Sequence, residues 1–276
     1  MPSIAAIQLN GSSDIERNFR QTAALVAEAA AAGASLIATP EATDYLGPHE
    51  EKVALAEPID GPRARRYAAL AAQHGVQLLI GSVAERGPSP PGGGPPTHAY
   101  NTSLLFGPDG SLQASYRKIH LFDVDLLGQG GVRFAESART LPGDRLVVAE
   151  TPLGPLGLSV CYDLRFPELY RGLIDRGATL LSVPSAFTLM TGKDHWHTLL
   201  RARAIECQAT VIAPAQWGPH DDGGLRRSYG HALIIDAWGT VLAECGDGEG
   251  FCIAQVHPTR TARIRQEIPL AAHRRL

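Results

Sequence analysis

The sequence lacks the features that mark several large classes of protein. It has no long run of like charges, and its formal net charge is only −3 over 276 residues, so it offers no electrostatic footprint for nucleic acid or an anionic membrane surface. No stretch is apolar for long enough to span a bilayer, and residues 1–8 do not have the pattern of a signal peptide. We therefore expect a cytoplasmic protein that binds a small neutral or anionic molecule, and neither nucleic acid nor membrane.

Cysteine is scarce, and its spacing predicts no metal site. The chain has four cysteines without a C-x-x-C spacing, which indicates neither a zinc site nor a disulfide framework: Cys161, Cys207, Cys245 and Cys252. His195 and His197 stand two positions apart on a predicted helix, where side chains diverge, and no acidic cluster accompanies them. A packing or pocket-wall role is therefore favoured over a metal pair. We expect no metal and no organic cofactor.

Short apolar runs alternate with alanine-rich stretches along the chain. The runs that predict strands are 4–9, 35–39, 76–82, 156–160, 179–183, 210–215 and 251–256. Helices are predicted from a capping box at Ser13 and Glu16 to Gly33, at 62–75 and 167–177, and through 199–207. Turn residues predict hairpins around 108–110 and 237–239, and a proline-rich and glycine-rich loop at 87–96. This alternation predicts one α/β domain over residues 1–276.

Three chemically capable residues follow predicted strands. Glu41, Lys118 and Cys161 each come just after a strand end, where open α/β sheets gather their ligands. Taken singly they mean little, because a lone cysteine after an apolar strand is usually a small buried hydrophobe and a lone charge is usually solvated. Two triplets with the glycosylation pattern, at 10–12 and 101–103, carry no meaning in a cytosolic chain.

The segments around these residues resemble a known family. Pro40-Glu41, the Tyr-Arg-Lys-Ile-His run at 116–120 and the run at 161–168 that begins Cys-Tyr-Asp are similar to the three signature segments of the nitrilase superfamily of carbon-nitrogen hydrolases. The similarity extends through 121–125, 184–187, 191–196, 201–206 and 228–231. These further segments resemble the amidase branch that acts on deaminated glutathione, whose close neighbour is the omega-amidase branch.

The chemistry of amide hydrolysis requires these residue types. A free thiol, with a pKa of about 8.5, is only slightly ionised at neutral pH and needs activation. Glu41 can accept the thiol proton as general base, while Lys118 lowers the pKa of Cys161 and then stabilises the oxyanion. The backbone N–H of Tyr162 is the natural second oxyanion donor. Collapse of the intermediate expels ammonia and leaves a thioester on Cys161, which water activated by Glu41 hydrolyses.

The resemblance also implies a fold, an assembly and a fourth residue. The fold is a four-layer α-β-β-α sandwich, and two subunits pack through helices into a homodimer. Glu136 stands where the family has a second glutamate, which hydrogen-bonds Lys118 and keeps its ammonium charged; the alternative for Glu136 is a solvated surface charge. Arg165 either supports the local backbone through an ion pair with Glu168 or contacts substrate.

The substrate is expected to be a small carboxylate-bearing amide. Phe187, Thr191 and His195 are the candidate pocket walls, and the segment 229–231 favours deaminated glutathione, which would yield 2-oxoglutarate and cysteinyl-glycine. The alternatives are an omega-amidase acting on α-ketoglutaramate, another amidohydrolase of the superfamily such as a carbamoyl-amino-acid hydrolase, and a non-catalytic binding protein on the same scaffold.

Overall fold

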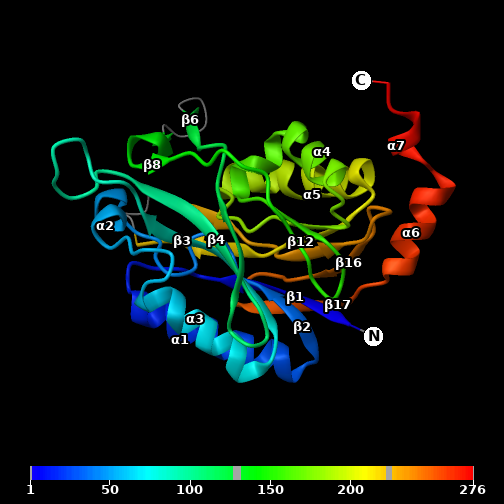
Figure 1. The fold of residues 1–276 in the computed structure, drawn as a ribbon, viewed down its shortest axis with the longest axis horizontal. Coiled ribbons are helices and arrows are strands. Elements are labelled where there is room, and N and C mark those ends of the chain that lie inside the picture. The colour runs from blue at the N-terminus through cyan, green and yellow to red at the C-terminus, as the bar shows by residue number, and fades with distance from the viewer. Residues whose placement is uncertain (1, 127–131, 222–225, 276) are drawn as a thin grey trace.

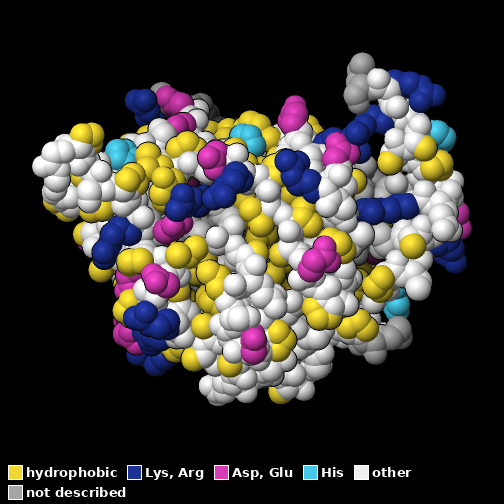
Figure 2. All heavy atoms as spheres, in the orientation of Figure 1, with side chains coloured by type: hydrophobic (Ala, Val, Ile, Leu, Met, Phe, Trp, Pro, Cys, Tyr) yellow, Lys and Arg dark blue, Asp and Glu magenta, His cyan; other side chains and the backbone are white. Residues whose placement is uncertain are grey.

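The chain folds as a four-layer α-β-β-α sandwich. A computed structural model describes residues 2–126, 132–221 and 226–275. Helices α1 (Ile15–Ala31) and α3 (Pro62–His74) cover one outer face, and α4 (Pro167–Asp175) and α5 (Leu189–Cys207) cover the other, with the two main sheets between them (Figure 1). No helix in the described ranges is long and apolar enough to cross a membrane. On the face drawn in Figure 2, basic and acidic side chains are interspersed, and neither sign gathers into a continuous patch.

Within the described residues, the first sheet has nine strands. Its main path runs in the order β14 (Arg227–Tyr229), β13 (Ala215–Pro219), β1 (Ser3–Leu9), β2 (Ala34–Ala38), β3 (Gln77–Arg86), β4 (Ala99–Phe106) and β5 (Leu112–Arg117). Strand β17 (Gly250–Gln255) pairs antiparallel with β1, and β8 (Thr140–Leu141) pairs with β4. Strands β1, β2 and β3 are parallel, and their carboxyl ends therefore lie at the same edge.

The second sheet has six strands in the part of the chain that the structure describes. Its order is β16 (Val241–Glu244), β15 (Leu233–Ile235), β12 (Thr210–Ala213), β11 (Leu180–Ser182), β10 (Leu156–Leu158) and β9 (Val148–Ala149). The other elements are α2 (His49–Ala54), the hairpin of β6 (Asp123–Leu126) and β7 (Val132–Ala135), the 3₁₀ helices at Glu136–Ala138 and Cys161–Arg165, and α6 (Pro258–Glu267) and α7 (Leu270–His273) near the C-terminus.

Strand β1 shows why the interior strands appear as unbroken apolar runs. Its Ile4 and Ala6 belong to the core between the two sheets, whereas Ala5 and Ile7 belong to the core under α1, together with Val26. Both faces of the strand are buried, so neither set of alternating positions needs to be polar. The period-two pattern of a half-exposed strand is consequently absent, as the sequence indicated.

Two local predictions are wrong. Helix α1 is capped by Asp14, whose carboxylate accepts the Arg17 N–H at 2.9 Å, so Ser13 and Glu16 form no capping box. The strand predicted at 210–215 is divided at Pro214 into β12 and β13, which belong to different sheets. Pro214 has no N–H with which to continue a ladder, and its carbonyl instead accepts the Ser185 N–H at 3.0 Å.

Most other predicted elements are present. Helix α3 begins at Pro62 and is closed by Gly75 in the left-handed conformation, at φ 62°. Strands β4 and β5 form the predicted hairpin, with Gly110 at φ 79° in its turn, and α4 runs from Pro167 to just before Gly177. Strands β15 and β16 form the hairpin around Trp238.

Candidate active site

Glu41, Lys118 and Cys161 come together at one cavity. Glu41 follows β2, Lys118 follows β5, and Cys161 begins a 3₁₀ helix soon after β10. The Nζ atom of Lys118 donates to Glu41 Oε1 at 2.9 Å, and Lys118 is only 1% exposed. All three residues line a cavity of about 640 Å³. Segments that are far apart in the chain thus place a thiol, a carboxylate and an ammonium at one cavity.

Glu136 is a buried fourth member of this group. It begins a 3₁₀ helix after β7, and its Oε2 accepts hydrogen bonds from Lys118 Nζ at 2.8 Å and from the Phe122 N–H at 2.7 Å. Because Glu136 is only 7% exposed, it is not a solvated surface charge. Lys118 is therefore held between two carboxylates.

Asn101 is a site residue that the sequence reading missed. Its Nδ2 donates to Glu41 Oε1 at 2.9 Å and to Glu136 Oε1 at 3.2 Å, while its backbone carbonyl accepts the Lys118 N–H at 2.9 Å. The second oxygen of Glu41 accepts the Ala186 N–H at 3.0 Å. Every carboxylate oxygen beside Lys118 therefore has a defined donor, which fixes the orientation of both acids. No signal in the sequence distinguished Asn101, because Thr102 and Ser103 beside it in the strand are also polar.

The charges of the group determine its protonation. Burial acts to lower the pKa of Lys118, but the carboxylates of Glu136 and Glu41 outweigh it and raise that pKa well above its ordinary value. Burial acts to raise the pKa of Glu136, but the charges of Lys118 and Lys52 hold it at about 2. Lys118 and Glu136 are consequently an ammonium and a carboxylate at neutral pH.

The expectation that Lys118 gives Cys161 a low pKa is wrong in its net result. Lys118 does lower the pKa of the thiol, but burial and the neighbouring Glu41 carboxylate together raise it well above its ordinary range. Cys161 is only 8% exposed, so a thiolate there would have little hydration. Cys161 is therefore a neutral thiol at neutral pH, beside the Glu41 carboxylate.

The turn that carries Cys161 is fixed by its backbone and by a buried acid. Cys161 has a φ of 48°, a left-handed conformation uncommon for a non-glycine residue, and its N–H donates to the Pro184 carbonyl at 2.9 Å. Asp163, fully buried, accepts from the Val160 N–H at 2.9 Å and from the Tyr116 hydroxyl at 2.7 Å. This carboxylate therefore ties the Cys161 turn to the strand that leads into Lys118.

The residue predicted as oxyanion donor, Tyr162, belongs to this turn. Tyr162 lines the cavity as the second residue of the 3₁₀ helix at Cys161–Arg165. Amides in the first turn of a helix have no carbonyl partner within the helix, so they are available to an anion.

Two of the three predicted pocket-wall residues line the cavity. Phe187 and Thr191 do so, whereas His195 does not and instead lies behind Arg165, with its Nδ1 3.3 Å from Arg165 Nη1. The Arg165 guanidinium carbon lies 5.1 Å from the Phe187 ring centroid, and Arg165 also lines the cavity. Arg165 and Glu168 form no ion pair in the described part of the chain, so Arg165 belongs to the cavity wall.

Cationic and imidazole groups that were not predicted also line the cavity. They come from α2, from the segment around β7 and from β14: His49, Lys52, Arg133, Arg139, Arg226 and Arg227. Burial and the nearby charges of Arg226 and Lys52 lower the pKa of His49 to about 4. The buried His49 Nδ1 has no hydrogen-bond partner among the residues that the structure describes. The cavity is therefore suited to an anionic ligand.

Known proteins share both the sequence and the fold. The carbon-nitrogen hydrolase family matches residues 3–266. Deaminated glutathione amidase from Bos taurus is 42% identical over 277 residues, which cover 100% of this chain and 82% of that protein.

Two solved structures extend this likeness to three dimensions. The NitFhit protein of C. elegans superimposes with a TM-score of 0.89 at 38% identity, over 99% of this chain and 65% of that one. Nit3 of Saccharomyces cerevisiae, a member of branch 10 of the nitrilase superfamily, superimposes with a TM-score of 0.85 at 29% identity, over 100% and 97% of the two chains. The chain belongs to the carbon-nitrogen hydrolase family, within the nitrilase superfamily.

Proposed function

We propose that this protein is an amidase that uses Cys161 as nucleophile, Glu41 as general base and Lys118 as the cation that stabilises the oxyanion. The observation that carries the proposal is the position of Lys118 Nζ, 2.9 Å from Glu41 and 2.8 Å from Glu136, at the cavity that Cys161 lines. Burial of an ammonium costs desolvation free energy, and an apolar side chain could fill the same space without that cost. The presence of the ammonium here supports a catalytic role, and argues against a binding protein without catalysis.

The raised pKa of Cys161 determines how the first step proceeds. The thiol transfers its proton to Glu41 as sulfur attacks the amide carbonyl, so no free thiolate has to accumulate. Charge then moves from the carboxylate to the substrate oxygen, where Lys118 and the Tyr162 N–H stabilise it. Glu41 returns the proton to the departing amine, and a thioester remains on Cys161. Water deprotonated by Glu41 then hydrolyses the thioester. Glu136 and Asn101 keep Lys118 and Glu41 aligned through both steps.

The substrate that the cavity supports best is deaminated glutathione. Cationic groups such as Lys52 and Arg227 suit its carboxylates, and a volume of about 640 Å³ lies within the usual range for ligands of this size. The departing amine is then that of cysteinyl-glycine, and 2-oxoglutarate remains as the acyl product. The activity in the name of the Bos taurus relative supports the same choice.

The decisive measurement is kcat/KM for deaminated glutathione and for α-ketoglutaramate on one preparation, because specificity is a ratio of these values. We expect a ratio well above one. A ratio below one would assign the protein to omega-amidase activity instead. The Cys161→Ala variant is the negative control, and should retain less than about 1% of the wild-type kcat with an unchanged circular dichroism spectrum, because loss of a nucleophile costs several orders of magnitude.

The role of Lys52 in holding the substrate carboxylate has a matched control. Lys52→Met should raise KM about tenfold or more with a smaller effect on kcat, because it removes a charge–charge contact made in both the ground and the transition state. Lys193→Met, an exposed lysine of α5 that does not line the cavity, should leave both constants unchanged. Equal effects of the two substitutions would show that Lys52 does not contact the substrate.

We propose further that the chain acts as one catalytic domain, that it works in the cytoplasm and that it forms a homodimer. The family match across residues 3–266 supports the single domain. Exposed apolar side chains on the outer helix α5, namely Leu189, Met190 and Ile205, support a helix-mediated contact between two copies.

A further inference from the structure

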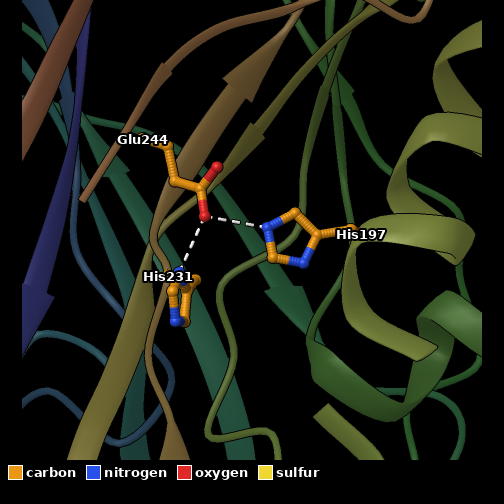
Figure 3. A group of neighbouring side chains, drawn as sticks. All are labelled: His197, His231 and Glu244. Atoms are coloured by element: carbon orange, nitrogen blue, oxygen red, sulfur yellow. Dashed lines mark hydrogen bonds and ion pairs between the residues drawn. The ribbon is translucent and has the colours of Figure 1, made fainter. Parts of the chain in front are cut away.

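A second group of chemically capable side chains lies outside the cavity. His197 Nε2 and His231 Nδ1 both approach Glu244 Oε1, at 2.8 and 2.7 Å (Figure 3). The side chains belong to α5, to the segment after β14 and to β16, and all three point toward one another. None of them lines the cavity that contains Cys161. The sequence does not reveal this group, because Glu244 lies 47 residues from His197 in the chain.

The three side chains form a set that binds metal ions in other proteins. Among the described residues, they are the one group of three or more His, Cys, Asp or Glu side chains with suitable geometry, and their candidate ligand atoms lie within 4.8 Å of one another. Two imidazole nitrogens and a carboxylate oxygen are preferred ligands of Zn²⁺ and related divalent ions. A tetrahedral ion with ligands at about 2.0–2.2 Å separates them by about 3.3 Å, so small side-chain rotations from the present hydrogen bonds are sufficient.

The ligands are held in place by their surroundings. The carbonyl of His231 accepts the indole N–H of Trp196 at 2.8 Å, and its backbone is in the left-handed region at φ 57°. The His231 ring stacks on Tyr229 with centroids 4.5 Å apart. Burial acts to raise the pKa of Glu244, but hydrogen bonds from His197 and His231 outweigh it and lower the pKa, which keeps the carboxylate ionised. The three side chains are 28–33% exposed, so an ion can enter from solvent and keep a water ligand.

We propose that His197, His231 and Glu244 form a binding site for a divalent transition metal ion of the Zn²⁺ class, with at least one coordination position open to solvent. The site is separate from the amidase centre. Each imidazole nitrogen that now faces Glu244 must present a lone pair to the metal instead of a hydrogen bond to the carboxylate.

An ion bound at this site would connect two elements next to the cavity. It would join α5 to the β15–β16 hairpin, and the first turn of α5 carries Thr191 on the cavity wall. Gly192, beside Thr191, packs so closely on Tyr229 that a side chain there would collide with that ring. An ion at His197 and His231 would consequently stiffen one wall of the cavity from behind.

The test is a titration of the full chain with Co²⁺ alone, followed by visible absorption, after treatment with a chelator. The background is Cys161→Ala, which removes the cavity thiol as a competing ligand. We expect one Co²⁺ per chain, displaced by Zn²⁺, and a Zn²⁺-dependent rise in Tm. His197→Gln and Glu244→Gln should each weaken Co²⁺ binding at least about tenfold, since even residues that only orient metal ligands contribute that much.

His273→Ala is the matched control, because His273 is an exposed histidine of α7 that does not belong to the group. It should bind Co²⁺ as the background protein does. Unchanged Co²⁺ affinity in both ligand variants would overturn the proposal, and so would thiolate-to-cobalt charge-transfer absorption, which would assign the ion to a cysteine. Absence of both Co²⁺ absorption and any Zn²⁺ effect on Tm would show that the group is only a hydrogen-bonded cluster. None of these outcomes depends on the amidase activity proposed above.

Discussion

At the scale of single residues, the site is organised around the buried ammonium of Lys118, which needs carboxylate partners to be stable. Lys118 is hydrogen-bonded to two carboxylates, and the side-chain amide of Asn101 donates to both of them. Removal of any member leaves a buried charge or dipole without its partner, which costs more than the contact itself contributes. The motifs predicted Glu41, Lys118 and Cys161 because their chemistry is specific. They did not reveal Asn101, since its importance arises from strand pairing and not from its neighbours in the sequence.

The opposing influences on Cys161 lead to a prediction about Glu41→Gln. The Glu41 carboxylate raises the pKa of the thiol and Lys118 lowers it, so removal of the carboxylate charge should lower that pKa. The midpoint of the pH profile for alkylation of Cys161 by iodoacetamide should shift to lower pH, although amide turnover falls by at least about a hundredfold for want of a general base. Peptide mapping and kcat measure the two effects. An unchanged or higher midpoint would mean that Glu41 does not govern the thiol.

A second prediction concerns acid stability and Glu136. Its pKa in the folded protein is about 2, below the ordinary value of 4.5, so its ionised form stabilises the fold above about pH 4.5 and this stabilisation is lost as pH falls toward 2. Glu136→Gln should lower the free energy of unfolding at pH 7 by about 1–3 kcal/mol, the usual cost of a buried charged hydrogen bond. It should also lose less stability between pH 5 and pH 2 than the wild type does.

Glu168→Gln is the control for that experiment, because Glu168 is exposed in the first turn of α4. Denaturant unfolding at a series of pH values provides the comparison. If the pH dependence of Glu136→Gln matches that of the wild type, Glu136 is not ionised beside Lys118 as described.

At the scale of elements, the helices and hairpins that could be predicted are those whose ends are marked by proline, glycine or turn residues in their own sequence. Pro62 and Gly75 bracket α3, and the Pro-Asp-Gly turn fixes the hairpin of β4 and β5. Helix α2 could not be predicted, because six residues are too few to show a period, yet it carries His49 and Lys52 to the cavity. The division at Pro214 was missed for a related reason: both flanking strands are buried, so the apolar run continues across the crossing between sheets.

Gly81 gives a prediction at this scale. It lies on β3 against the segment that leads into Glu41, and a side chain there would collide with the carbonyl oxygens of Thr39 and Pro40. Gly81→Ala should therefore destabilise the fold by about 1–3 kcal/mol through overpacking, and lower kcat because Glu41 is displaced. Gly246→Ala is the matched control, since no atom lies within 4 Å of the added carbon. Thermal unfolding and kcat should separate the two variants; a Gly81→Ala protein that behaves like the control would mean that this contact is not restrictive.

At the scale of the whole molecule, the four layers could not be predicted from the hydrophobic periodicity of the sequence. Alternating strands and helices specify an α/β protein, but not whether the strands form one sheet or two. Distant pairings decide this, such as that of β17 with β1, which places residues near the C-terminus beside the first strand. The resemblance to the nitrilase superfamily did predict the four layers, because proteins of that superfamily share the same long-range strand pairings.

The outer helix α5 carries the last prediction, which concerns assembly. Ile205 is 48% exposed on this helix, although one side of it lies against Gly239 of the β15–β16 hairpin. If two copies pack through α5, burial of Ile205 favours association, and Ile205→Glu should replace that contact with two facing carboxylates. Light scattering should give the wild type a mass of twice 29.4 kDa and the variant a mass near 29.4 kDa. Leu112→Glu, at a comparable 43% exposure on β5, changes charge equally and should remain dimeric. A dimeric Ile205→Glu protein would place the interface elsewhere, and a monomeric wild type would remove the dimer altogether.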